Sequence, residues 1–412
     1  MDQLYAKCAG LDVHKESVVA CVRIVVDGKA RSDTKTFRTT TIELLALSDW
    51  LGGHACTHVA MEATGVYWKP VWHILEGRFE LILANPGHVK NVPGRKTDVK
   101  DAEWLADLLA HGLIRSSFVP PTPIQELRDL TRTRKQLTRE AARHVQRIHK
   151  VLEDANVKIT SVLSNIIGVT GRRILLALIE GIDDPNDLVL LRDPRVKASK
   201  QQFVDALTGY VTENHRFLLR THLDQIDSIQ NSINRVEAQL GKHLEAFRTS
   251  EQLLITVPGI KETTAQVILA EIGADMSRFP SADHLVSWAG LCPRNDESAG
   301  KRRSTRIGKG APWLKTTMIQ AAWGAARTKD SYLNAQYLRL KSRRGPKKAV
   351  VAVAASMLRS IYHMLKDQVP YKDLGPNHFD KHRSRSRIDF LTRRIQALGY
   401  SVTLTKNPLA TP

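Results

Sequence analysis

The sequence predicts an α/β domain followed by a mainly helical remainder, the class α/β plus α, on three observations. In the first 115 residues, strand-like and helix-like runs alternate. Between residues 127 and 247, apolar residues recur at seven-residue spacing in two long stretches, as they do in paired helices. The 412 residues also exceed the size at which a single hydrophobic core keeps growing, so two or three domains are expected.

The first region is expected to hold a mixed β-sheet flanked by helices. Apolar and β-branched runs bounded by turn residues predict the strands, and 3.6-residue periodicity predicts the helices. Strands are expected at 8–13, 17–23, 34–37, 57–61 and 79–84, and helices at 42–51, 66–75 and 102–113. The first three strands suit an antiparallel meander, and the order βββαβαβα predicts helices against a mixed sheet.

A break in the chain at Pro120, Pro121 and Pro123 separates this region from the long helices. The seven-residue spacing predicts two helices that pair through apolar seams. The apolar positions are Leu127, Leu130, Leu137, Ala141, Ile148 and Val151, and then Leu219, Leu223, Ile226, Ile233, Val236, Leu240, Leu244 and Phe247. The many charges on the outer faces favour a projecting coiled-coil arm for assembly or docking, with an ordinary helical bundle as the alternative. Residues 156–214 between the two stretches are expected to form short helices.

A second compact region is expected from residue 251 to 345. The segment Val257–Lys261 precedes a helix at 263–272 and resembles the turn of a helix-hairpin-helix. Such a turn offers backbone N–H groups to a phosphate, or serves only as a glycine turn between helices. Residues 346–412 are expected to hold an apolar helix at 347–366 and a basic tail. The predicted domains are therefore 1–118, 119–250, 251–345 and 346–412.

The charge of the chain points to a polyanionic partner. Lys and Arg number 61 against 42 Asp and Glu, a formal net charge of +19. DNA or RNA is the leading candidate, because the longest apolar stretch, 349–358, is too short to span a bilayer and no signal peptide opens the chain. We therefore expect a cytoplasmic protein with no membrane partner. The four cysteines lie far apart and are expected to be reduced thiols, most of them buried.

Four acidic residues follow predicted strands or begin a helix in the first region. Asp12 ends the first strand, Glu62 ends the fourth, and Asp98 and Asp101 stand at the start of the last helix, on one helix face. Strand ends in a sheet of this order can converge, and a carboxylate cluster can hold two Mg²⁺ ions about 4 Å apart on a phosphodiester. The alternatives are that Asp98 caps a helix and that Asp12 and Glu62 end strands in turns.

Ser298 lies in a stretch of polar and basic residues that we expect to be a flexible, cationic loop. Guanidinium and ammonium groups there would stabilise extra negative charge on phosphorus and favour an alkoxide on the serine. A loop serine can equally be without function, and the basic residues can simply contact phosphates. The candidate nucleic-acid contacts are Lys15, Lys96, Lys261, Arg294, Lys301, Arg302, Arg303, Arg306, Lys309, Arg343 and Arg344.

These motifs resemble those of the bridge-RNA-guided DEDD transposases of the insertion sequence 110 family over most of the chain. The segments Gly10–Lys15, Met61–Gly65 and Lys96–Ala102 are similar to the three acidic motifs of the family's RuvC-like, RNase H-type domain. The segments Val257–Ile260 and Ala289–Lys309 resemble its second conserved domain.

The resemblance implies a mechanism and partners that composition and spacing do not show. Asp12, Glu62, Asp98 and Asp101 would bind Mg²⁺, with Mn²⁺ as an alternative, and Ser298 would join covalently to a DNA end. The partners would be donor and target DNA, a noncoding bridge RNA and further copies of the chain, in a dimer or tetramer at the bacterial nucleoid. Lys261 stands where the hairpin often has a second glycine, and Ala299 where a glycine often follows the serine.

Three functions are compatible with the sequence. The leading hypothesis is a transposase or recombinase that cuts and rejoins DNA through a serine-linked intermediate. A RuvC-like nuclease or resolvase that uses a metal-bound water would need the four acids but not Ser298. A non-enzymatic nucleic-acid-binding scaffold would need neither.

Overall fold

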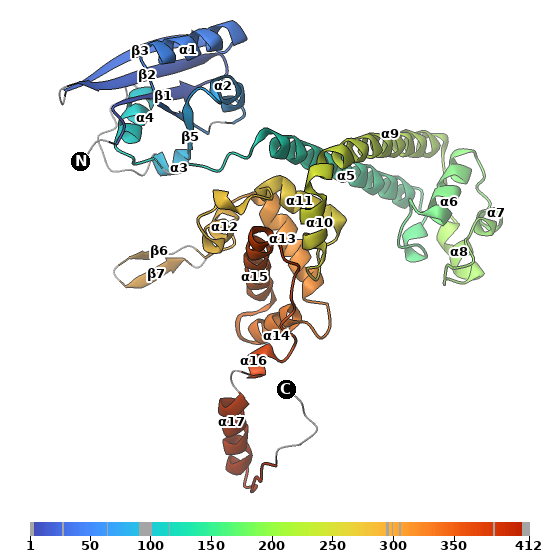
Figure 1. The fold of residues 1–412 in the computed structure, drawn as a ribbon. Coiled ribbons are helices and arrows are strands. Elements are labelled where there is room, and N and C mark those ends of the chain that lie inside the picture. The colour runs from blue at the N-terminus through green and yellow to red at the C-terminus, as the bar shows by residue number, and fades with distance from the viewer. Residues whose placement is uncertain are drawn as a thin grey trace. The chain divides into compact units, whose positions relative to one another are not determined.

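The protein divides into two compact units, Met1–Val119 and Pro120–Pro412 (Figure 1). This computed structural model describes residues 4–26, 29–63, 65–89, 101–114, 116–293, 296–298, 300–304, 306–381 and 384–405. The boundary falls at the first residue of the proline-rich break. The finer division of the second unit at residues 250 and 345 stays a prediction.

The first unit contains a five-stranded mixed sheet in the order β3-β2-β1-β4-β5 (Figure 1). The strands are β1 (Lys7–Val13), β2 (Ser17–Val26), β3 (Lys29–Arg38), β4 (His58–Glu62) and β5 (Glu80–Ala84). The first three form an antiparallel meander, whereas β4 runs parallel to both β1 and β5. The predicted α/β class with a mixed sheet is confirmed.

Strand β3 is longer than the sequence indicates, and the reason is its place at the edge of the sheet. We expected a strand only at 34–37, but β3 pairs with β2 along its whole length from Ser17↔Arg38 to Val26↔Lys29. Of its ten residues, only Phe37 is buried. An edge strand with this exposure needs no alternation of apolar residues, so most of β3 carries no hydrophobic signal.

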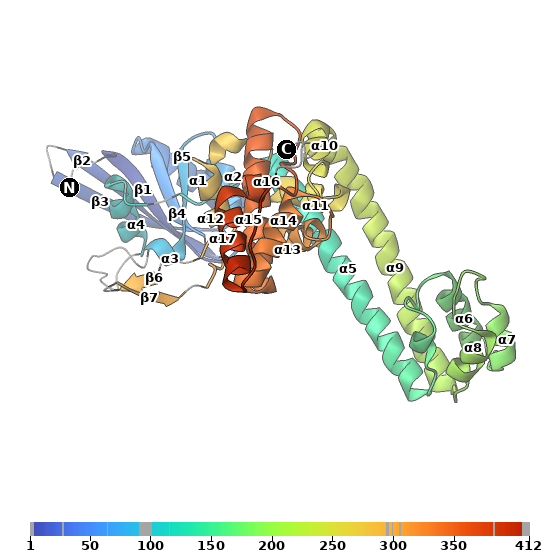
Figure 2. The ribbon, with the colours of Figure 1, turned by 90° about the horizontal axis from the view of Figure 1, so that it is seen from below.

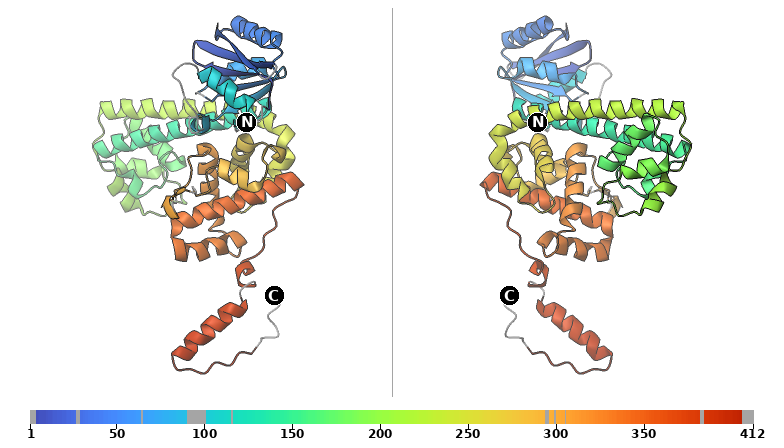
Figure 3. Two further views of the ribbon diagram at one scale, coloured as in Figure 1. Left: turned by 90° about the vertical axis from the view of Figure 1, so that its left-hand side faces the viewer. Right: turned by 90° about the vertical axis from the view of Figure 1, so that its right-hand side faces the viewer.

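Helices cover both faces of the sheet (Figure 3). They are α1 (Thr41–Gly53), α2 (Trp68–Leu75), α3 (Pro86–Val89) and α4 (Asp101–Ala110). Ala9, Leu11 and Val13 of β1 share a core with α1 and α2, whereas Cys8 packs with Leu109 of α4. Because side chains alternate along a strand, Gly10 and Asp12 lie on the same face as Cys8, the face that α4 covers.

The approach of α4 to β1 requires glycine at position 10. A Cβ atom at Gly10 would stand 2.2 Å from the carbonyl oxygen of Ala102 and 2.5 Å from the backbone nitrogen of Ala106. Backbone atoms cannot yield as a flexible side chain can, so any side chain at this position would push the helix away. Gly10 therefore holds the first turns of α4 directly against β1.

The cysteines agree with the prediction of reduced and mostly buried thiols. All four are free, and Cys8, Cys21 and Cys56 are buried. Burial raises the pKa of the Cys8 thiol to about 11 and that of the Cys56 thiol to about 12. Both thiols are therefore protonated and unreactive near neutral pH.

The second unit begins with two long helices, α5 (Thr122–Asp154) and α9 (Glu213–Leu244), which lie side by side (Figure 3). They are antiparallel, because Leu127 near the start of α5 packs with Leu240 near the end of α9, and Ile148 packs in one core with Leu219. The predicted pairing of two long helices is therefore present. A coiled-coil role in oligomerisation stays a proposal.

The residues between the two long helices form a small helical cap at their far end (Figure 2). It comprises the 3₁₀ helix η1 (Ile159–Ser161), α6 (Val169–Ile179), α7 (Pro185–Leu190) and α8 (Lys200–Leu207). Its core joins Ile174, Leu188 and Phe203 to Ile148 and Leu219 of the long helices. The short helices expected between 156 and 214 are thus observed as one packed cap.

The described remainder of the second unit consists mainly of helices and includes a two-stranded hairpin. The elements are η2 (Glu245–Phe247), α10 (Arg248–Ile255), α11 (Glu262–Ile272), η3 (Met276–Arg278), α12 (Ala282–Trp288), β6 (Asp296–Ser298), β7 (Lys301–Ser304), α13 (Pro312–Ala325), α14 (Tyr332–Arg344), α15 (Pro346–Asp367), α16 (His378–Lys381) and α17 (Ser384–Ala397). Helix α15, expected at 347–366, packs against α10, α12, α13 and α14. Its apolar sequence reflects this central position.

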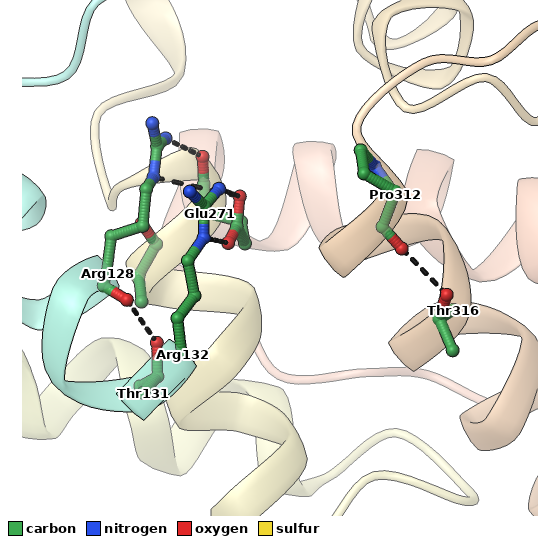
Figure 4. A network of polar contacts seen from close by, with 7 residues as sticks. Arg128, Thr131, Arg132, Glu271, Pro312 and Thr316 are labelled. Atoms are coloured by element: carbon green, nitrogen blue, oxygen red, sulfur yellow. Dashed lines mark hydrogen bonds and ion pairs between the residues drawn. The ribbon is translucent and has the colours of Figure 1, made fainter. Parts of the chain in front are cut away.

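A buried ion pair joins α5 to α11 (Figure 4). Glu271 has a side chain that is 1% exposed, and its two carboxylate oxygens accept hydrogen bonds from Arg132 at 2.9 and 3.0 Å. Arg128 donates to the main-chain carbonyl oxygens of Ala270 and Glu271 at 3.2 and 2.6 Å. Burial lowers the pKa of the Arg128 guanidinium, and the charge of Glu271 opposes that shift. The carboxylate of Glu271 therefore compensates guanidinium charge that burial has largely removed from water.

We expect Glu271→Gln to destabilise the second unit by about 3 kcal/mol, because removing one partner leaves buried guanidinium charge without compensation. Thermal unfolding followed by circular dichroism measures the effect. Glu245→Gln is the matched control, since Glu245 forms an exposed pair with Arg248, with side chains 76% and 50% exposed. The control should leave the unfolding temperature unchanged. Equal shifts in the two variants would contradict a special role for the buried pair.

Candidate active site

Two of the four predicted acids end neighbouring strands of the sheet. Strands β1 and β4 are parallel, and the last pair in their register is Leu11↔Met61. Asp12 and Glu62 follow one residue later on each strand, at the same edge of the sheet. Ala60 packs with Cys8 and Leu109 on the α4 side, so the alternation of side chains puts Glu62 on the same face as Asp12. The two carboxylates therefore share both an edge and a face.

Helix α4 brings a third acid to this face. Asp101 is the first residue of α4, and the next residue, Ala102, places its carbonyl oxygen against Gly10, two residues before Asp12. The start of α4 and the end of β1 therefore lie together. The fourth acid, Asp98, lies outside the described residues, as does Lys96.

His14 contacts the carboxylate of Asp12. The Nε2 atom of His14 lies 3.1 Å from Oδ2 of Asp12, and the side chains are 61% and 25% exposed. The backbone N–H of His14 donates to the carbonyl oxygen of Ser17 at 2.9 Å, which closes the turn between β1 and β2. The histidine is thus a turn residue that also orients the Asp12 carboxylate.

The chemistry of this donor set suits a hard divalent cation. Carboxylate oxygens are the ligands that Mg²⁺ and Mn²⁺ prefer, and Asp12, Glu62 and Asp101 supply only such oxygens. Within the part of the chain that the structure describes, no group of three or more His, Cys, Asp or Glu side chains is spaced to hold a metal ion. Asp12, Glu62 and Asp101 all belong to that part and do not form such a group among themselves, and Asp98 lies outside it, so the predicted tetrad stays a prediction.

Ser298 lies in a β-hairpin and not in the flexible loop that we expected. Strands β6 and β7 are antiparallel, with Ser298 paired to Lys301 next to the turn. Gly300 in that turn has a φ of +72°, a conformation that glycine adopts without strain. The polar and basic sequence lacks the alternation of apolar residues that indicates strands, so periodicity could not predict the hairpin.

The base of this hairpin is held by close backbone contacts. A Cβ atom at Gly310, where φ is +51°, would stand 2.4 Å from the Cα atom of Gly290. Pro293 and Ile307 form an isolated β-bridge, and the Nζ atom of Lys315 donates to the carbonyl oxygens of Gly308 and Lys309 at 3.0 and 2.7 Å. Backbone contacts and the side chain of Lys315 on α13 therefore hold the base of the hairpin that carries Ser298.

The predicted nucleic-acid contacts lie on several elements. Those whose side chains are described are all exposed, and they are Lys15, Lys261, Lys301, Arg306, Lys309, Arg343 and Arg344. Arg302 and Arg303 lie on β7, with side chains outside the description, and Arg294 lies outside the described residues. Lys15 is in the turn that follows Asp12, whereas Arg343 and Arg344 end α14. Exposure of the described side chains is compatible with phosphate contacts and does not test them.

The turn between α10 and α11 has a clear packing role. Val257 and Ile260 are buried, and a Cβ atom at Gly259 would stand 2.3 Å from the carbonyl oxygen of Ala321 on α13. The turn therefore brings its backbone against α13, which favours the structural interpretation of Gly259. A phosphate grip by this turn stays a prediction.

The basic cluster of α5 was not predicted as a functional feature. The charged groups of Arg132, Lys135 and Arg139 lie 5.4, 5.4 and 5.6 Å from the ring centroid of Trp313 on α13. In the sequence these charges look like the solvated face of a long helix. The spacing of basic residues at i, i+3 and i+7 was the available signal, but only the packing of α13 identifies their partner.

Comparisons with known proteins match two parts of the chain to transposase families. Residues 9–157 match the family model of DEDD transposases of IS110, described as a transposase, and residues 251–338 match that of the Transposase IS116/IS110/IS902 family. The first match spans the sheet, its acidic residues and α5, and the second spans the hairpin with Ser298. No helix among those described is long and apolar enough to cross a membrane.

Curated relatives cover most of the chain. An insertion element IS110 uncharacterized 43.6 kDa protein of Streptomyces coelicolor is 28% identical over 307 residues, covering 69% of this chain and 74% of the relative. The pilin gene-inverting protein of Moraxella lacunata is 21% identical over 383 residues, covering 88% and 96%. The transposase for insertion sequence element IS1328 of Yersinia enterocolitica is 24% identical over 268 residues, covering 64% and 69%.

Two family models match successive parts of the chain, and relatives of the same kind align over most of its length. The chain therefore belongs to the IS110 family of DEDD transposases and is a DNA transposase or recombinase.

Proposed function

We propose that the chain recombines DNA by cutting and rejoining strands, with a carboxylate-bound divalent metal and Ser298 as nucleophile. One observation carries the proposal. Asp12 and Glu62 end adjacent parallel strands on the face covered by α4, and α4 begins at Asp101. Asp98, three residues before Asp101, would complete the set of four carboxylates.

The carboxylates of Asp12, Glu62, Asp98 and Asp101 would hold Mg²⁺, with Mn²⁺ as an alternative. Bound metal supplies positive charge that stabilises the attacking and leaving oxygens of a phosphodiester. His14 keeps the Asp12 carboxylate oriented through its contact of 3.1 Å. Gly10 keeps α4 against β1, and so keeps the start of that helix near Asp12.

Ser298 would take part in the exchange of phosphate esters. Its Oγ atom forms a bond to phosphorus and loses its proton, while one bond from phosphorus to a sugar oxygen breaks and that oxygen gains a proton. Lys301, paired with Ser298 across the hairpin, would stabilise the extra negative charge on phosphate. Because one ester replaces another, the same bond energy remains available for joining to a new strand.

The net charge of the chain and its relatives support a set of partners. The net charge of +19 suits a long polyanion, which we take to be donor and target DNA together with a noncoding bridge RNA. The relative from Moraxella lacunata is named for inverting a pilin gene, which supports rejoining in addition to cutting. We propose that the paired helices α5 and α9 assemble copies of the chain into a dimer or tetramer at the nucleoid.

To test the proposal, the purified chain is incubated with labelled donor and target DNA. RNA transcribed from the sequences that flank the element is added to the same reaction. The reaction contains Mg²⁺ or EDTA and is resolved on a denaturing gel. We expect a slow-migrating protein–DNA product that protease removes, that EDTA prevents and that requires the RNA.

Two other outcomes would contradict parts of the proposal. Free cut ends without linked protein would indicate a nuclease or resolvase that uses water. A linked product that forms equally well without the RNA would contradict RNA guidance.

A further inference from the structure

A cavity of about 440 Å³ lies within the second unit, among helices α5, α9, α11 and α13. Its size is in the range of small-ligand sites. Neither the acidic residues of the first unit nor the hairpin that carries Ser298 contributes to its wall. Its lining is polar and charged on the α5 side, where Arg134, Lys135 and Arg139 contribute side chains.

The charges that line the cavity do not cancel. Three cationic side chains from α5 face one lining carboxylate, Glu237 of α9. Burial lowers the pKa of Arg134, and the charge of Glu237 opposes that shift. Burial also lowers the pKa of Lys135, with the nearby charge of Arg139 acting in the same direction. The cavity wall therefore carries excess positive charge that an anion would compensate.

Arg134 retains an unused donor. Its side chain is 8% exposed, and Nη1 donates to Oε1 of Gln266 at 2.8 Å. Its Nη2 atom is buried and has no hydrogen-bond partner among the described residues. A buried donor without an acceptor costs about 1–3 kcal/mol, so such a group commonly marks a missing ligand or water.

Uncharged polar groups also line the cavity. Thr263 and Thr264 belong to the first turn of α11, and Thr316 and Thr317 to the second turn of α13. The hydroxyl of Thr316 already donates to the carbonyl oxygen of Pro312 at 2.7 Å, so Thr316 is not one of the free donors. Lys261, the N-cap of α11, makes no side-chain hydrogen bond to the helix, so the side chain leaves the first N–H groups of α11 uncapped. Threonine hydroxyls and a helix N-terminus are groups that bind phosphate oxygens.

The ring of Trp313 contacts two of the cationic side chains. Lys135 and Arg139 each lie within 5.6 Å of its ring centroid, where the face of the ring attracts positive charge. The same two side chains line the cavity. The ring therefore limits the rotamers of both side chains before any ligand arrives, which reduces the entropy cost of binding.

We propose that this cavity binds a phosphate group of a single nucleic-acid strand. Several convergent donors, excess positive charge and room for an attached sugar suit a phosphodiester better than they suit a carboxylate or an apolar ligand. The site requires neither the metal nor Ser298. It would anchor a strand to the junction of the long helices with α11 and α13, through residues that the proposed chemistry does not use.

The test is fluorescence anisotropy of a labelled 20-nucleotide single strand, as DNA and as RNA, with the full chain in EDTA. The variant K135Q/R139Q removes two charges from the cavity wall. The control R143Q/K150Q removes two charges from exposed positions of the same helix that do not line the cavity. Thermal unfolding verifies that both variants are folded, as expected because none of the four side chains is buried.

We expect K135Q/R139Q to weaken binding at least tenfold at low salt. It should also make the slope of log K against log salt shallower by about 0.7 for each phosphate that the variant no longer neutralises. The control should change affinity less than twofold. The strand, DNA or RNA, whose affinity falls further identifies the source of the phosphate.

Equal decreases in variant and control, or no decrease in either, would overturn the proposal. Titration with inorganic phosphate and with a mononucleotide, followed by calorimetry, separates a free ligand from a strand. Binding of the free compounds that depends on Lys135 and Arg139, with strand affinity unchanged, would also overturn it. Since no metal is present and no bond is broken, none of these outcomes depends on the proposed recombination.

Discussion

Replacing Ser298 with alanine is expected to abolish the covalent protein–DNA product entirely. Alanine lacks the Oγ atom that would bond to phosphorus, and no rearrangement of the hairpin can restore it. The change should not disturb the fold, because Ser298 stands next to the turn between two short strands. The measurement is a denaturing gel of labelled DNA after incubation with metal and RNA, with the linked product quantified against wild type.

Ser304→Ala is the matched control for this experiment. Ser304 lies on the opposite strand of the same hairpin, where it pairs with Asp296. Ser304 carries the same hydroxyl in a similar cationic sequence. If losing any hydroxyl from the hairpin were harmful, both Ser298→Ala and Ser304→Ala would form less of the linked product. A linked product that persists in Ser298→Ala would show that another residue is the nucleophile.

The second large effect is expected from Asp12→Asn, which should slow strand cleavage roughly several thousand-fold. The amide cannot supply the negative charge that holds a divalent cation, and metal stabilisation of a transferring phosphate contributes several kcal/mol. A loss of about 5 kcal/mol corresponds to between three and four powers of ten in rate. Single-turnover cleavage of labelled DNA measures this, and calorimetry with Mn²⁺ measures the accompanying loss of metal affinity.

Asp49→Asn tests whether the effect is specific to the acidic site. Asp49 lies on α1, on the other face of the sheet, and its side chain is 75% exposed in a pair with Arg78. Cleavage and metal affinity should both be unchanged in this variant. If Asp12→Asn cleaved at the wild-type rate, the acids at the ends of β1 and β4 would have no catalytic role.

Much of the acidic site could be predicted from sequence because its residues are marked locally. Asp12 and Glu62 each follow a short run of apolar, β-branched or small residues, and a run of this length and composition predicts a buried strand. Parallel strands end at the same edge, so the convergence of the two acids follows once the strand order is assumed. These runs do not indicate which face of the sheet carries the two carboxylates. That face is identified by the packing of α4 against Gly10.

Three other features could not be predicted, because each depends on pairing or packing with another segment of the chain. Most of β3 and the hairpin around Ser298 are polar, and their strands exist because of pairing with a neighbouring strand. The cavity among α5, α9, α11 and α13 joins residues more than 100 positions apart. Its charges resemble an ordinary solvated helix face until the other helices are in place.

Local residue patterns were sufficient to predict the α/β class, the pairing of two long helices, the break at the prolines and the acidic motifs. These depend on periodicity and on turn residues, which act over a few positions. The packing of the folded chain was needed to establish which face Asp12 and Glu62 share, how the hairpin with Ser298 is held and where the cations of α5 meet Trp313. Those features arise from contacts between distant segments, and no local pattern of residue types encodes which distant segment will be the partner.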